Sequence, residues 1–121
     1  MTYIDGFVLA VPTANREKYE AAARKFDGMM IAHGALRAVE GWGDDVPHGK
    51  RTDFHRATEA NADETVVFSW TEWPDKQVRD TAHAAINKAM AEAAEPMDMP
   101  FDGARMIYGG FATLFDLGDK A

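Results

Sequence analysis

Residues Met99–Phe111 read MPFDGARMIYGGF, and this stretch decides the fold. It opens with a turn signal, Pro-Phe-Asp-Gly, and continues into an apolar strand that carries adjacent glycines, Gly109 and Gly110. A pair of glycines inside a strand usually marks a bulge or a place where another group approaches the backbone closely. We therefore interpret the rest of the chain as the layers that surround this strand.

Runs of β-branched, aromatic and alternating apolar residues predict four strands. Their expected bounds are Tyr3–Val11, Ala35–Gly43, Glu64–Trp73 and Met106–Asp116. The first and third are apolar on both faces, which is typical of strands covered on both sides. Between the second and third strands lies a long connection, 44–63, in which Thr52 or Asp53 is expected to cap a short helix over Phe54–Ala60.

Apolar residues at helical spacing predict two long helices. The first runs from Arg16 to about His33, with Thr13 or Asn15 as its N-cap and Gly34 as its stop. The second starts at Asp75 and is expected to end at Pro96. On the first helix, the side chains assigned to the buried stripe are Tyr19, Ala22, Ala23, Phe26, Met29 and Met30, and those assigned to the wet face are Arg16, Glu20, Arg24 and Asp27.

The element order β-α-β, β-α-β indicates one α+β domain over residues 1–121, a ferredoxin-like split βαβ sandwich. Its four-stranded antiparallel sheet would have the order 4-1-3-2, with two helices on one face. The other face is still apolar, and a monomer rarely leaves such a face in water. The sequence therefore predicts a homodimer that packs sheet to sheet.

Composition excludes several classes of function. The 121 residues carry a net charge of -7, which argues against nucleic acid or an anionic membrane as partner. The chain has no cysteine, so disulfides, thiol catalysis and thiolate metal sites are excluded. No leader or membrane-spanning run is evident, so we expect a cytoplasmic protein.

Five blocks of sequence resemble the YbaA-like family of small bacterial proteins, a domain of unknown function. The blocks are YIDGF (Tyr3–Phe7), HGAL (His33–Leu36), GDDVP (Gly43–Pro47), DETVVFSW (Asp63–Trp70) and Met99–Phe111. The resemblance implies the dimeric α/β-barrel superfamily, and with it a dimer. It implies no established activity, because relatives in that superfamily range from monooxygenases to small-ligand regulators.

His33 and Glu40 are the candidate catalytic residues. His33 closes a helix, where it can serve as a general base or simply cap the last carbonyl groups. Glu40 shares a strand face with apolar residues, where its pKa would rise; alternatively, it faces water on an edge strand.

The candidate substrate-binding residues are aromatic or charged side chains near strand ends. Arg105 could clamp an anionic group and Tyr108 could orient it, although an ion pair of Arg105 with Asp5 or Asp102 is the commoner fate. Aromatic side chains could wall a pocket or belong to the core. The complete candidate set is Trp42, Asp45, Trp70, Arg105 and Tyr108.

Asp44, Asp45, His48 and His55 could offer oxygen and nitrogen ligands to a metal ion. Their spacing matches no known metal loop, and the aspartates also suit a turn, so we expect neither a metal nor another cofactor.

Two functions remain open from the sequence. The first is a cofactor-independent enzyme whose small-molecule pocket lies between the sheet and the helices, near Gly109 and Gly110. The alternative is a non-catalytic module that binds a metabolite or a protein.

Overall fold

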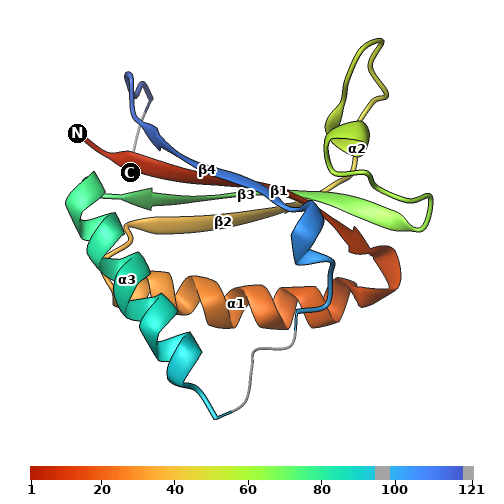
Figure 1. Cartoon of the computed structure of the whole chain (residues 1–121). Coiled ribbons are helices and arrows are strands. Elements are labelled where there is room, and N and C mark those ends of the chain that lie inside the picture. The colour runs from red at the N-terminus through yellow and green to blue at the C-terminus, as the bar shows by residue number, and fades with distance from the viewer. Residues whose placement is uncertain (95–98, 119–121) are drawn as a thin grey trace.

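The structure, a computed structural model, describes residues 1–94 and 99–118 (Figure 1). Pro96, the expected end of the second long helix, lies outside these residues. The elements in chain order are β1 (Tyr3–Pro12), the 3-10 turn η1 (Thr13–Asn15), α1 (Arg16–Ala32), β2 (Arg37–Trp42), α2 (Phe54–Ala57), β3 (Glu64–Trp73), α3 (Lys76–Glu92), the 3-10 turn η2 (Gly103–Arg105) and β4 (Ile107–Ala112).

The four strands form one open antiparallel sheet with the order β2-β3-β1-β4. This is the predicted strand order. Helices α1 and α3 cover one face of the sheet, whereas α2 and the connection around it lie on the opposite side (Figure 1). The described chain is therefore an α+β fold with three helices and a sheet that is covered by long helices on one face only.

The ends of the helices follow local capping chemistry, with one correction. Asp53 and Asp75 cap α2 and α3 by accepting hydrogen bonds from the backbone N–H groups of Arg56 and Val78. Asn15 occupies the N-cap position of α1, as one alternative held, but its side chain does not make the predicted hydrogen bond to the first turn. The amide of Asn15 instead donates to the Pro100 carbonyl at 3.0 Å and ties the start of α1 to the approach to β4.

The helix-covered face holds two clusters of buried side chains. One lies where α1 and α3 meet the sheet and contains Met30, Ala35, Trp73, Ala82 and Ile86. The other lies under the first half of α1 and contains Leu9, Val11, Tyr19 and Val67. Tyr19 is the residue of α1 that enters this second cluster, so the phenol sits at the boundary between core and cavity.

A buried carboxylate fastens α3 to the middle of the sheet. Asp5 is only 3% exposed, and it accepts hydrogen bonds from Trp73 Nε1 at 3.0 Å and from Arg79 Nη2 at 2.8 Å. His83 Nε2 lies 2.9 Å from the same carboxylate. A β-carbon on Gly110 would come within 2.5 Å of the Tyr3 hydroxyl and 2.9 Å of Arg79 Nη2. The predicted close approach at the glycine pair is thus made by this cluster.

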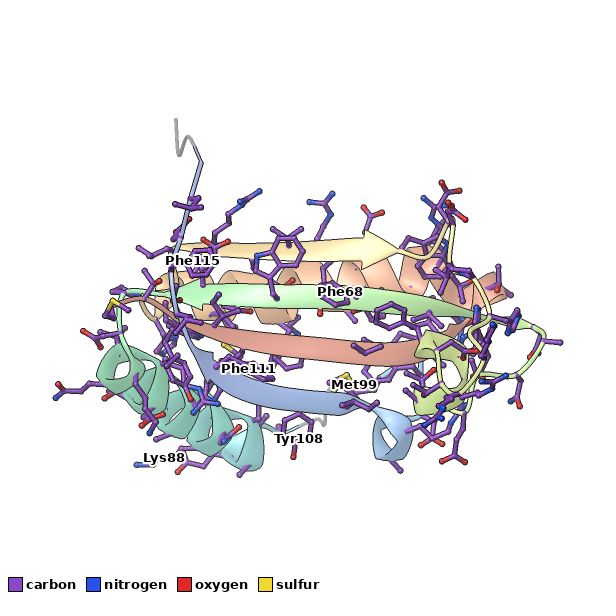
Figure 2. All side chains as sticks on the ribbon, turned by 90° about the horizontal axis from the view of Figure 1, so that it is seen from above. Phe68, Lys88, Met99, Tyr108, Phe111 and Phe115 are labelled. Carbon is purple, nitrogen blue, oxygen red and sulfur yellow. The ribbon has the colours of Figure 1, made fainter. Side chains whose placement is uncertain are left out.

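The opposite face of the sheet, which we call the open face, carries exposed apolar side chains. Phe68 on β3 and Phe111 on β4 lie on the side that Figure 2 views, and they are 47% and 61% exposed. The segment after β4 rises on this same side (Figure 1), and its Leu114, Phe115 and Leu117 are largely exposed. The predicted apolar face is therefore present.

Within 1–94 and 99–118, no helix combines the length and the apolar character that crossing a membrane would require.

Candidate functional site

Two adjoining cavities lie between α1 and the sheet. The outer one has a volume of about 510 Å³ and is lined by residues of α1, β2 and β3. The inner one, of about 110 Å³, reaches toward apolar side chains of β1 and of the approach to β4. Both are lined by Tyr19, Ala23, Asp27 and Glu40. These four residues therefore form the boundary between a solvent-facing chamber and an apolar one.

Helical and strand periodicity bring these residues together. Tyr19, Ala23 and Asp27 follow one another at intervals of four along α1, so they lie on the same side of the helix. Glu40 lies on β2 opposite Ser69 of β3, and both line the inner cavity. The hydroxyl of Tyr19 donates a hydrogen bond of 2.6 Å to Oε1 of Glu40. A phenol and two carboxyl groups thus face one small volume.

Burial and the neighbouring Glu40 carboxylate shift the pKa values of Asp27 and Tyr19. Partial burial, a hydrogen bond with Glu40 and repulsion by its charge raise the pKa of Asp27 to about 8. Burial, with the hydrogen bond to Glu40, raises the pKa of Tyr19 far above its ordinary value. At neutral pH, Asp27 is therefore mostly protonated, and Tyr19 is a neutral hydroxyl. The protonated carboxyl group of Asp27 is hydrogen-bonded to Glu40.

The outer cavity has a cationic and aromatic side. The guanidinium carbon of Arg16 lies 5.3 Å from the ring centroid of Trp42, and both residues line this cavity. Arg24 also lines it, but its Nε donates to Glu20 at 3.1 Å. Within the described part of the chain, Arg16 forms no hydrogen bond or ion pair with a carboxylate.

The two candidate catalytic residues have different surroundings. Glu40 lies on the edge strand β2, as predicted by the alternative in which it faces water. Its side chain nevertheless faces α1 and lines both cavities, as predicted by the alternative in which it shares a face with apolar residues. His33 follows α1, and its Nδ1 lies 2.9 Å from the Met29 carbonyl, in keeping with a helix cap. His33 lines neither cavity. Tyr19, rather than the other candidate catalytic residue His33, is the hydrogen-bond partner of Glu40.

The aromatic candidates are divided between the two faces of the sheet. Trp42 lines the outer cavity. Trp70 pairs with Val39 on the open face, and its Nε1 donates to Glu72 at 2.9 Å. Tyr108 is 70% exposed and projects beyond the edge of β4 (Figure 2). Asp45 is exposed in the long connection, so of these four candidates only Trp42 borders the cavities.

Arg105 makes structural ion pairs. Its guanidinium binds Glu64 at 2.7 and 2.8 Å and Asp102 at 3.0 Å, and these contacts join the approach to β4 with the start of β3. The Arg105 guanidinium holds the pKa of Glu64 below its usual range. The pair with Asp102 was among the alternatives from the sequence, whereas Asp5 pairs with Arg79 instead.

The histidines of the long connection stack on each other. The rings of His48 and His55 are 4.3 Å apart, and His55 Nε2 lies 2.9 Å from the Val46 carbonyl. No group of three or more His, Cys, Asp or Glu side chains with the geometry of a metal site occurs in the described segments. Gly109 and Gly110 line neither cavity, because Tyr3 and Arg79 occupy the space beside Gly110.

Sequence reasoning missed three residues of this site: Arg16, Tyr19 and Asp27. Tyr19 was assigned to the core, and Arg16 and Asp27 to the wet face of the helix. The assignment of Asp27 is wrong, since it lines both cavities. Its spacing of eight residues from Tyr19 was the available signal, because it places the carboxyl on the same stripe as the phenol.

Comparison with known proteins returns one family and a group of relatives. The family, described as "Protein of unknown function (DUF1428)", matches residues 2–103. The chain is 49% identical over 118 residues to "Uncharacterized protein YbaA" of Escherichia coli strain K12, with 96% of this chain and 99% of the relative covered. It shows the same identity and coverage with the YbaA protein of Shigella flexneri. The printed names assign no activity to these relatives.

Proposed function

The chain belongs to the YbaA-like family of proteins of unknown function, DUF1428, and we propose a function for it from its site. The proposed function is that of a cofactor-independent enzyme that moves protons on a small organic molecule. One observation carries this proposal: Tyr19, Asp27 and Glu40 converge on the boundary of two cavities between α1 and the sheet. Titratable side chains that line one pocket are typical of sites for general acid–base catalysis.

The two carboxyl groups suit opposite roles. Asp27, whose pKa is raised to about 8, is a proton donor at neutral pH, and Glu40 is the group that accepts a proton. For a carbonyl compound, Glu40 would take a proton from the carbon beside the carbonyl while Asp27 gives one to the carbonyl oxygen. The product is the enol, and return of the proton to the same carbon exchanges that hydrogen with solvent. Where that carbon also carries a hydroxyl group, the product is an enediol, and Glu40 can return the proton to the former carbonyl carbon while Asp27 takes the proton of the other hydroxyl, which gives an isomer. This exchange balances without an oxidant or a metal.

Tyr19 positions the base. Its hydroxyl donates to Oε1 of Glu40 at 2.6 Å, and Asp27 also hydrogen-bonds to this carboxyl group, so a substrate would meet Glu40 in place of Asp27. The phenol remains neutral because its pKa is raised, so it acts as a fixed hydrogen-bond donor. Tyr19 is buried against Leu9, Val11 and Val67, and this packing restricts the movement of its ring.

The test is a ligand screen followed by proton exchange. A library of small carbonyl compounds would be screened by thermal shift, and each stabilising compound would be incubated with the protein in D₂O and followed by NMR. We expect deuterium at a carbon of at least one compound with the parent, and about a 100-fold slower exchange with Glu40→Gln. Binding that persists in Glu40→Gln, with no exchange by the parent, would indicate a non-catalytic metabolite-binding module instead.

A homodimer is the second part of the proposal. The open face and the segment after β4 expose Phe68, Phe111, Leu114, Phe115 and Leu117 on one side of the molecule. A second copy related by a two-fold axis would cover these side chains with the same surface, completing a ferredoxin-like dimeric barrel.

Sedimentation measures this assembly. We expect a dimer at micromolar concentration, and we expect Phe68→Glu to produce a monomer of 13.4 kDa. Lys88→Gln, an equal change in charge on α3 away from the open face (Figure 2), is the control and should remain dimeric. A parent protein that sediments as a stable monomer would contradict the proposal.

A further inference from the structure

We propose that the cavities take an amphipathic organic acid: a carboxylate bound by Arg16, with an apolar body that enters the inner cavity. This inference rests on the proposed function, since it names the class of molecule on which the carboxyl pair acts. It stands on three features of the cavities, which are an unpaired cation, a polar centre and an apolar end.

The cation is Arg16. Its guanidinium is held against the ring of Trp42, 5.3 Å from the centroid, and it has no carboxylate partner in the described part of the chain. The contact with Trp42 is made over the face of the ring. The planar fork of N–H groups on the guanidinium matches the two oxygens of a carboxylate. Arg24 is a poorer anion site because Glu20 already neutralises it.

The apolar end is the inner cavity. Phe7, Leu9 and Phe26 line it together with Met99, Phe101 and Met106. The polar atoms of the inner cavity come from Ser69 and from the three titratable residues that also line the outer cavity, which are Tyr19, Asp27 and Glu40. Methionine side chains adapt to ligands of varied shape, so an alkyl or aryl group would be accepted there. A charged group would be expelled from this end by desolvation.

The order of these features sets the orientation of the ligand. Arg16 lines only the outer cavity, Asp27 and Glu40 line both, and the phenylalanines line only the inner one. An acid whose carboxylate meets Arg16 would therefore extend its chain toward the boundary that Asp27 and Glu40 share with the inner cavity. A second anionic group would have to lie beside Glu40 or enter the apolar inner cavity, and both places disfavour it, so the class is the monocarboxylic acid.

The test uses defined probes with the full-length protein. Octanoate and 4-phenylbutyrate would be titrated by NMR and calorimetry at pH 7, alongside octanamide and octylamine, which keep the chain and change the head group. We expect saturable binding of the acids, with shifts of the Trp42 indole signal, and at least about tenfold weaker binding of the amide and amine. Octanamide that binds as tightly as octanoate would overturn the inference. So would the absence of binding of either acid at a concentration of 10 mM.

Variants locate the head group. Arg16→Gln should weaken octanoate binding by about tenfold or more, because a charge-assisted contact is lost. Lys18→Gln makes the same change in charge on α1 at a residue that lines neither cavity, and it should bind as the parent does. Octanoate affinity that is unchanged in Arg16→Gln would contradict the assignment.

The dependence of affinity on the chain length of the acid tests the placement of its apolar part in the inner cavity. Octanoate should bind more tightly than butyrate to the parent, and Ala22→Leu, which narrows the inner cavity, should reduce that preference. Affinities that do not depend on chain length in the parent would contradict the apolar placement even if Ala22→Leu failed to fold.

The two proposals fail in different ways. Binding of octanoate that survives in Asp27→Asn and Glu40→Gln, without proton exchange on any acid, would retain the ligand class and reject the catalysis. Proton exchange on neutral carbonyl compounds that bind as tightly in Arg16→Gln would retain the catalysis and reject the ligand class.

Discussion

The Tyr19 hydroxyl donates a hydrogen bond of 2.6 Å to Oε1 of Glu40, and this contact joins the first turns of α1 to the edge strand β2. The contact connects residues 21 positions apart through an otherwise hollow region. It therefore contributes both to the stability of the edge strand and to the position of the candidate base.

Tyr19→Phe tests the contribution of this contact to stability. Removing the hydroxyl keeps the ring in the core and deletes one hydrogen bond to a carboxylate, so we expect a loss of about 1–2 kcal/mol. In thermal melts of a 121-residue chain this corresponds to a decrease in Tm of about 4 °C per kcal/mol. Tyr108→Phe, at an exposed phenol, is the control and should melt as the parent does.

A double-mutant cycle makes that prediction specific. In Glu40→Gln, the further change Tyr19→Phe should cost less than it costs in the parent, because the charged acceptor is already absent. Additive effects of the two substitutions would show that the hydroxyl and the carboxylate are not coupled.

Asp27→Asn tests the ionisation of the carboxyl pair. The folded-state pKa of Asp27, about 8, lies above its ordinary value of 3.8. The carboxyl therefore contributes stability that is fully present below pH 4 and is lost as the pH rises through about 8. The asparagine mimics the protonated form and keeps that stability. We expect equal stability of variant and parent near pH 4 and an advantage of the variant that grows until about pH 9.

The size of this advantage is limited by solvent. Asp27 is half-buried beside an open cavity, so about 1–2 kcal/mol is the expected ceiling. Urea unfolding at a series of pH values would measure it. A difference between variant and parent that does not change with pH would contradict the raised pKa.

The sequence was sufficient for the sheet where residue patterns and turn signals agree. Strand β3 has the predicted bounds, Glu64–Trp73, because a β-branched and aromatic run is enclosed between Asp63 and Pro74. Gly34 ends the first helix as expected, and its φ of +110° is a conformation that glycine adopts without strain. In both places, one local signal marks the boundary.

The end of strand β4 is set by its pairing with β1, which the local sequence pattern does not reveal. The fourth strand was expected to reach Asp116 but ends at Ala112, because Ala112 pairs with Tyr3, the first residue of β1. Beyond that point, Thr2 alone continues the pairing: its carbonyl accepts from Thr113 N at 3.2 Å, and its hydroxyl donates to the Thr113 hydroxyl at 2.7 Å. The apolar residues that follow were assigned to a strand by pattern, yet the described chain gives them no further strand to pair with.

The candidate site was predicted only in part for the same reason. Glu40 and Trp42 could be singled out because a charged or aromatic side chain interrupts a short strand. Asp27 has a charged side chain among other charged residues of a helix, and only its register with Tyr19 reveals that it faces the sheet. Arg105 stands beside Asp102 in the sequence, but its pairing with Glu64 depends on how β3 and η2 meet.

Asp5→Asn tests the buried anchor of α3. The carboxylate accepts from Arg79 and Trp73 at 3.1 Å or less, and neutralising it would leave the Arg79 guanidinium partly buried without its counter-charge. We expect a loss of about 3–5 kcal/mol in the free energy of unfolding by urea. Asp80→Asn removes a surface carboxylate that also binds Arg79, and it should cost far less, because solvent screens an exposed ion pair. Similar effects of the two changes would contradict the anchoring role of Asp5.

Gly110→Ala tests the close approach at β4 from the opposite side of the same cluster. The new β-carbon would lie 2.5 Å from the Tyr3 hydroxyl and 2.9 Å from Arg79 Nη2, so one of these side chains must move. Movement of Arg79 would loosen its bond to Asp5, and we expect a loss of about 1–3 kcal/mol. Gly109→Ala is the matched control, because its β-carbon would meet Phe111 at 3.5 Å, an ordinary contact, and should change the stability by less than about 1 kcal/mol. Equal melting temperatures for the two variants would show that the sheet has room beside Gly110, and that Tyr3 and Arg79 do not need the glycine there.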